Sequence, residues 1–132
     1  MTINGIWNEE SIRQELRRLD HITGLHGAEL PITFGKARSQ LGSFHIDPKK
    51  RKPKKFHFSL FYFANPEWSR ESALETIQHE YAHYMDYILY GQSGHGTTWR
   101  MCCRKTQDVE KELNVKGLSR ILIINHFQQV IF

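Results

Sequence analysis

The sequence predicts an α+β fold in which a small sheet of about three strands packs against one long helix and flanking helices. Apolar residues recur at helical spacing in two segments, near residues 9–20 and 73–88. Between them, residues 32–46 and 56–63 are rich in β-branched and aromatic residues, which is typical of strands. The chain has no internal repeat and no low-complexity linker. A single domain over residues 1–132 is therefore the simplest interpretation.

The first half of the chain predicts a helix followed by a strand region. Asn8 is typical of a helix N-cap, and the two glutamates after it suit the first turn. Apolar residues at helical spacing then continue this helix to about Asp20. The segment "ITFGKARSQLGSFHI" at 32–46 is interrupted by Gly35 and Gly42, so it predicts one bent strand or two short ones.

The segment "FHFSLFYF" at 56–63 is the clearest strand signal. It is mostly apolar, so we expect it to be buried on both faces. The basic tract before it contains Pro48 and Pro53 and predicts a turn. Pairing of 32–46 with 56–63 around this turn would form a long β-hairpin.

The second half predicts a long helix, a glycine loop and a further helix. Ser69 or Asn65 is the expected N-cap of the long helix, which ends at Gly91. The loop "GQSGHG" follows, and the next helix runs from Thr97 or Thr98 to about 113, before a short strand and an apolar tail. The core-facing stripe of the long helix is expected to consist of Ala73, Leu74, Ile77, Tyr81, Tyr84, Met85 and Ile88.

Composition indicates a globular protein outside the membrane. Of the 132 residues, 39% are hydrophobic and 24% are charged, which excludes a disordered chain. No run approaches the ~20 apolar residues that cross a bilayer, and the N-terminus does not resemble a secretory signal. The two cysteines, Cys102 and Cys103, are neighbours and poorly placed for an internal disulfide. A cytoplasmic (or nucleoid-associated) location is the expectation.

The segment "HEYAH" lies within the long predicted helix. His79 and His83 are one turn apart, so both imidazoles can reach one zinc ion. Glu80 lies about a quarter turn away, where its carboxylate can accept a proton from a water molecule held by the metal. H-E-x-x-H is the pattern of zinc metallopeptidases. The alternative is the polar face of an ordinary helix in a chain with eight histidines.

A catalytic zinc site needs a third protein ligand. The H-x-x-G-x-x-H spacing of Met-turn proteases is excluded, because Asp86 and Leu89 stand at the two positions concerned. Glu110 and Glu112 are candidates on the following helix. His95 is the better candidate, because the flanking glycines allow the chain to turn back towards the first two histidines.

The segment "HEYAHYMDYILYGQSGHGTTWRMCCRK" resembles the SprT-like zinc metallopeptidases, which include the Spartan-type proteases. That family has H-E-x-x-H, a connection of variable length, and a third histidine in H-G-x-x-[FW]. The pattern is matched here by His79, Glu80, His83, His95, Gly96 and Trp99. The upstream strand segments are also similar, so the resemblance covers about residues 9 to 110.

The resemblance implies a zincin-like protease core with one catalytic Zn²⁺ and a protein or peptide substrate. Glu80 would be the general base, and His79, His83 and His95 the metal ligands. The chain lacks the cysteine pairs of the C-terminal zinc ribbon that many relatives carry, so no second zinc is expected. A zinc-stabilised nucleic-acid-binding module without catalytic turnover is the main alternative, and a metal-free interaction domain is another.

The tract "KKRKPKK" is the main source of the net charge of +4. Without it the chain has 12 basic and 14 acidic residues. Such a tract can bind a phosphate backbone, and the resemblance implies action on proteins at DNA. A solvated hairpin tip is the alternative. The candidate DNA-contacting residues are Lys49, Lys50, Arg51, Lys52, Lys54 and Lys55.

Overall fold

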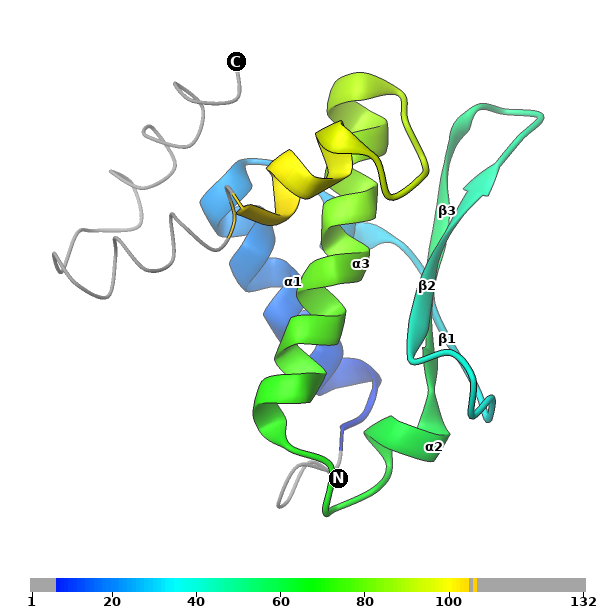
Figure 1. Ribbon diagram of the computed structural model, residues 1–132, viewed down its shortest axis with the longest axis vertical. Coiled ribbons are helices and arrows are strands. Elements are labelled where there is room, and N and C mark those ends of the chain that lie inside the picture. Colours follow the sequence, from blue (N-terminus) through cyan, green and yellow to red (C-terminus); the bar gives the residue numbers. More distant parts are fainter. Residues whose placement is uncertain (1–6, 105, 107–132) are drawn as a thin grey trace, which may run out of the picture.

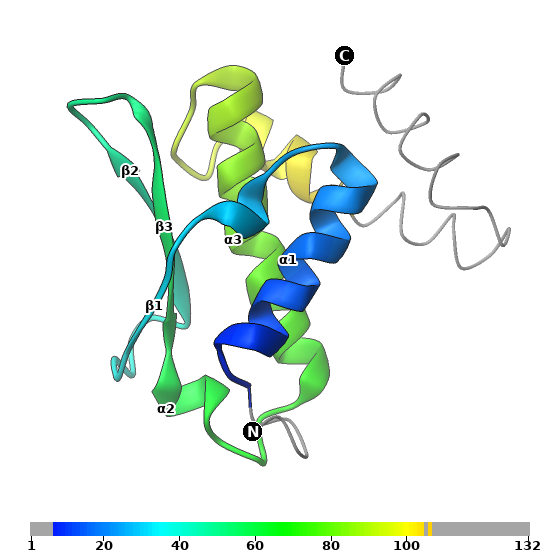
Figure 2. The same ribbon diagram turned by 180° about the vertical axis from the view of Figure 1, so that it is seen from behind.

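Helix α3 (Arg70–Tyr90) lies between a three-stranded sheet and helix α1 (Glu9–Thr23), as both views of the computed structural model show (Figures 1 and 2). The structure describes residues 7–104 and residue 106. This arrangement confirms the predicted α+β class and the small sheet. The remaining elements are η2 (Gly27–Glu29), β1 (Ile32–Gly35), β2 (Gly42–Asp47), β3 (Lys52–Ser59), α2 (Leu60–Phe63) and a helix over 97–104 that includes residue 106.

Helix α1 begins as predicted and ends three residues later than predicted. The Asn8 side chain accepts a hydrogen bond from the Ser11 backbone N–H, and the Ser11 hydroxyl accepts one from the Asn8 N–H. These two bonds satisfy amides that the first turn would otherwise leave unpaired. The helix continues past Asp20 because Ile22 is fully buried in the core. It ends at Gly24, whose φ of 78° suits a residue without a side chain.

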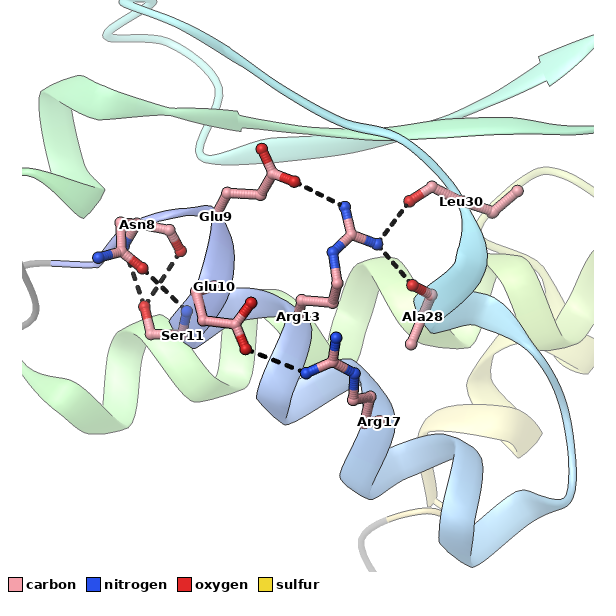
Figure 3. Close-up of polar contacts among 8 residues, drawn as sticks. All are labelled: Asn8, Glu9, Glu10, Ser11, Arg13, Arg17, Ala28 and Leu30. Carbon is pink, nitrogen blue, oxygen red and sulfur yellow. Dashed lines mark hydrogen bonds and ion pairs between the residues drawn. The ribbon is translucent and has the colours of Figure 1, made fainter.

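Arg13 ties the start of α1 to the segment that leads into the sheet (Figure 3). Its guanidinium donates hydrogen bonds to the carbonyl oxygens of Ala28 and Leu30, at 2.5 and 3.0 Å. It also pairs with Glu9 one turn earlier. Figure 3 shows a second pair on the same helix, between Arg17 and Glu10. Because Arg13 holds both carbonyls, the chain enters β1 at a fixed position relative to α1.

The sheet has the order β1-β3-β2. Strand β1 pairs with β3 in parallel, and β2 pairs with β3 in the antiparallel direction. Residues 32–46 therefore form two short strands, which was one of the two predicted alternatives. Strand β2 is an edge strand of this sheet, with α3 beside it.

The predicted strand over 56–63 is wrong at both ends. Strand β3 begins at Lys52, inside the basic tract, and ends at Ser59. Ser59 caps α2, because its hydroxyl accepts a hydrogen bond from the Phe61 N–H. Pro53 is tolerated in the strand because β1 pairs only with residues 56–59. The hairpin of β2 and β3 is confirmed, with a shorter turn at 48–51 that Asp47 stabilises by accepting from two backbone amides.

The core lies on both sides of α3, against α1 and against one face of the sheet. Phe56 and Phe58 are fully buried, and the Phe56 ring lies 6.2 Å from that of Tyr84 on α3. The opposite face of β3 carries His57, which is only partly buried, so the expectation of a strand buried on both faces is wrong. Ile88 is 45% exposed and does not belong to the core stripe. Among the residues described, no helix is long and apolar enough to cross a membrane.

Polar groups fix the register of α3 against α1. The Tyr81 hydroxyl lies 2.7 Å from both the Asp20 carboxylate and the Thr23 hydroxyl. Asp20 also accepts hydrogen bonds from the backbone amides of Gly27 and Ala28. Burial raises the pKa of Asp20, while these hydrogen bonds act in the opposite direction. Tyr81 is fully buried, so the helix carrying "HEYAH" has one well-defined orientation.

Candidate active site

The segment "HEYAH" lies in the second half of α3, where residues 81–86 are all buried. Helical spacing predicts that His79 and His83 lie roughly opposite the core-facing stripe, and this prediction holds only in part. His79 and Glu80 are half-buried, but His83 is 8% exposed. The difference arises because the sheet, α1 and the helix at 97–104 surround this part of α3, and helical periodicity along α3 cannot reveal all three neighbours.

The chain returns to α3 immediately after leaving it. Helix α3 ends at Gly91, whose φ of 67° allows the reversal, and the next helix begins at Thr97. This second helix brings Trp99 against the first histidine, and the indole N–H donates a 3.3 Å hydrogen bond to the carbonyl oxygen of His79. The start of the second helix is thus attached to the middle of the first.

This return places His95 beside His83. Their Nε2 atoms are 3.1 Å apart, and their ring centroids are 4.7 Å apart. Two nitrogens bound tetrahedrally to one zinc ion at ~2.0–2.1 Å would be separated by about 3.3 Å. The observed separation is thus close to that of two ligands of one metal ion. The sequence-based choice of His95 is consistent with this geometry.

Trp99 forms a common wall for the three histidines. Its ring centroid lies 5.8 Å from that of His79, 5.0 Å from His83 and 4.8 Å from His95. In the described part of the chain, no group of three or more His, Cys, Asp or Glu side chains is arranged to hold a metal ion. The structure therefore brings His83 and His95 together and leaves His79 on the same indole, one turn earlier on α3.

Burial and neighbouring histidines set the protonation of His83. Burial lowers its pKa to about 4, and His95 and His79 contribute further in the same direction. The imidazole is therefore neutral at neutral pH, with a nitrogen lone pair available. A neutral imidazole is the form that binds a metal ion.

Glu80 faces a cleft between α3 and the edge strand β2. The cleft has a volume of about 250 Å³, and its walls include Glu80, His83 and His95. Burial raises the pKa of Glu80 to about 7. A carboxylate with such a pKa can both accept and return a proton near neutral pH, as a general base and acid must.

The opposite wall of the cleft comes from residues that sequence analysis did not select. They lie on β2 and beside it, and they have no distinctive spacing that would mark them. Their only signal is the alternation of β2, which places Phe44 and Ile46 on the same face of the strand. These wall residues are Gln40, Gly42, Ser43, Phe44, Ile46 and, from the loop after α3, Ser93.

The raised pKa of Glu80 predicts a pH-dependent stability in the zinc-free protein. Its ordinary pKa is 4.5, so between about pH 4.5 and 7 the folded chain keeps a proton that the unfolded chain has lost. The stabilisation is complete below this window and is lost as the pH rises through it. In urea unfolding, wild type is therefore expected to lose stability relative to Glu80→Gln as the pH rises across this window. The opposing effect of His83 is present in both proteins and cancels, so parallel curves would contradict the expectation.

The remaining candidate residues lie outside the cleft or outside the described part of the chain. In the basic tract, Lys49, Lys50 and Arg51 are exposed on the hairpin turn, and Lys52, Lys54 and Lys55 belong to β3. Cys102 is fully buried, and burial raises the pKa of its thiol to about 12, so it is a packing residue. Glu110 and Glu112, the end of the last predicted helix and the predicted C-terminal strand lie outside the described residues.

The family model described as "SprT-like family" matches residues 19–118, which is most of the chain. The chain belongs to the SprT-like family. The matched span of this SprT-like protein begins within α1 and contains the sheet, α3 and the loop with His95. The resemblance inferred from the sequence is thereby confirmed. No curated protein and no solved structure matches the chain.

Proposed function

We propose that this SprT-like protein is a zinc-dependent metallopeptidase with a zincin-like active site. The observation that carries the proposal is the 3.1 Å approach of the His83 and His95 Nε2 atoms beside Glu80 in one cleft. His79 would complete the ligand set, since it lies one turn from His83 and contacts the same indole. Imidazole nitrogens are preferred ligands of zinc, so the donor chemistry fits.

Each residue has a definite role in this proposal. A bound zinc ion would supply positive charge that polarises the scissile carbonyl and makes a water molecule more acidic. Glu80 would take the proton from that water and deliver it to the leaving amine. Trp99 packs against all three imidazoles, and the walls of the cleft partly bury Glu80.

The shape of the cleft favours an extended peptide as substrate. Strand β2 is an edge strand, and four of its residues line the cleft opposite Glu80. An exposed edge can pair with an added strand through main-chain hydrogen bonds, without selecting a particular side chain. A substrate peptide lying along β2 would pass directly in front of the catalytic carboxylate.

Metal analysis of the purified chain tests this proposal. Wild type is expected to hold about one zinc ion per chain and to cleave an unfolded test protein. His95→Ala is expected to reduce the zinc content strongly and to abolish cleavage, because only two ligands remain. His21→Ala is the matched control, since His21 is exposed on α1 and does not line the cleft. Wild type without zinc, or His95→Ala with full zinc content, would refute the metal site.

We further propose that the β2–β3 hairpin contacts DNA during this reaction. Lys49, Lys50 and Arg51 are exposed at the turn that follows β2, the strand that lines the cleft. Replacing these three by alanine should weaken binding to single-stranded DNA. A plot of the logarithm of the binding constant against the logarithm of the salt concentration should become less steep, its slope less negative by about 2 for three lost phosphate contacts. Arg17→Ala on α1, which pairs with Glu10, is the control. An unchanged slope, measured by fluorescence anisotropy, would leave the hairpin as a solvated turn.

A further inference from the structure

Asp86 lies on α3 one turn after His83, and it is a buried carboxylate without a partner. It is 1% exposed, and neither of its oxygens makes a hydrogen bond in the described part of the chain. No lysine, arginine or histidine among the described residues forms an ion pair with it. Burial of an unpaired carboxylate is strongly unfavourable. Asp86 therefore requires a partner, and none of the described residues is that partner.

A cavity adjoins this carboxylate. Its volume is about 540 Å³, and its walls include Asp86, Gln92, Thr97 and Thr98. It is separate from the catalytic cleft, because Gly94 and Gly96 line this cavity whereas Ser93 and His95 line the cleft. The two spaces thus lie on the two sides of the same loop.

The chemistry of these walls selects a hard cation. The side chains that line it include one carboxylate, one amide oxygen and three hydroxyl oxygens, the third from Tyr90. No imidazole contributes to the walls and no thiol does, so a softer metal such as zinc has better ligands on the other side of the loop. Mg²⁺ commonly keeps several waters and binds through one or two carboxylates, and Ca²⁺ accepts neutral oxygens readily. The cavity has room for an ion with part of its hydration shell.

We propose that this pocket binds a partly hydrated divalent cation, Mg²⁺ or Ca²⁺, with Asp86 as its charged ligand. Both carboxylate oxygens of Asp86 are buried, so the wall of the cavity must open locally to admit the ion. The cation would join the end of α3 to Thr97 and Thr98 at the start of the next helix. It would thereby fix both ends of the loop that carries His95. This site does not depend on the proposed peptidase activity.

Thermal unfolding of the zinc-loaded full chain tests the proposal. Unfolding is followed in MgCl₂, in CaCl₂, and in NaCl at the same ionic strength. Mg²⁺ and Ca²⁺ compete poorly for imidazole ligands, so the zinc site is not disturbed. When the cation concentration is about ten times its dissociation constant, the unfolding temperature of wild type is expected to be roughly 3–6 °C higher than in NaCl. Asp86→Asn is expected to lose this increment, and Glu75→Gln, an exposed acid on the same helix, to keep it.

Calorimetric titration of CaCl₂ and of MgCl₂ into the same proteins gives an independent measurement. Saturable binding of one ion to wild type, absent in Asp86→Asn, supports the site. No saturable binding to wild type overturns it, as does an equal midpoint shift in wild type and Asp86→Asn. A loss of stability in Asp86→Asn that is the same with and without divalent cations also overturns it, because the partner of Asp86 is then a group of the chain itself.

Discussion

Replacing Glu80 with glutamine is expected to abolish peptide hydrolysis and to leave the zinc in place. The amide keeps the size of the carboxylate but cannot accept a proton from water at neutral pH. Loss of a general base typically lowers the rate by about 10²–10⁴-fold. The three histidines are unchanged in this variant, so its zinc content should equal that of wild type. Cleavage of an unfolded test protein, with and without single-stranded DNA, provides the measurement.

This experiment also separates the peptidase from the binding module without turnover. A peptidase requires an active wild type and an inactive Glu80→Gln of equal zinc content. If both proteins hold zinc, bind DNA equally and leave every substrate intact, the binding module is the correct function. Glu75→Gln is the control, because it removes an exposed carboxylate from the same helix and should remain fully active.

Replacing Phe56 with alanine is expected to cause the largest loss of stability. Phe56 is fully buried at the centre of the sheet, and its ring contacts those of Phe44, Phe58 and Tyr84. Truncation of a buried phenylalanine typically costs about 3–5 kcal/mol. The free energy of unfolding of a domain is typically about 5–15 kcal/mol, so this single change removes a large share of the stability.

The comparison for this variant is Phe61→Ala on α2. Phe61 is 43% exposed, and its removal is expected to cost less than about 1 kcal/mol. Urea unfolding of both variants measures the difference. Equal losses would mean that the interface between β3 and α3 does not dominate the stability of the fold. Because Tyr84 lies one residue after His83, loss of Phe56 should also reduce zinc affinity, which metal analysis can measure.

Local chemistry of the sequence predicted several boundaries correctly. Asn8 and Ser69 cap their helices through their own side chains, and Gly91 ends α3 by adopting a left-handed conformation. Each of these signals acts within a few residues, so the tertiary structure had little influence on it. The prediction of a strand over 56–63 was wrong for a related reason. The Ser59 hydroxyl starts a helical turn, and the apolar run continues through this change of structure.

The sequence by itself determined the family and the helix that carries "HEYAH", and it predicted His95 as the third metal ligand. These follow from residue types at fixed spacing, and spacing within one helix sets which side chains are neighbours. Only the tertiary structure decided that His83 is buried, that Trp99 contacts all three histidines, and that β2 forms the opposite wall of the cleft. It also revealed the unpaired Asp86. These properties depend on which segments, far apart along the chain, pack together, and the period of a single element carries no information about its neighbours.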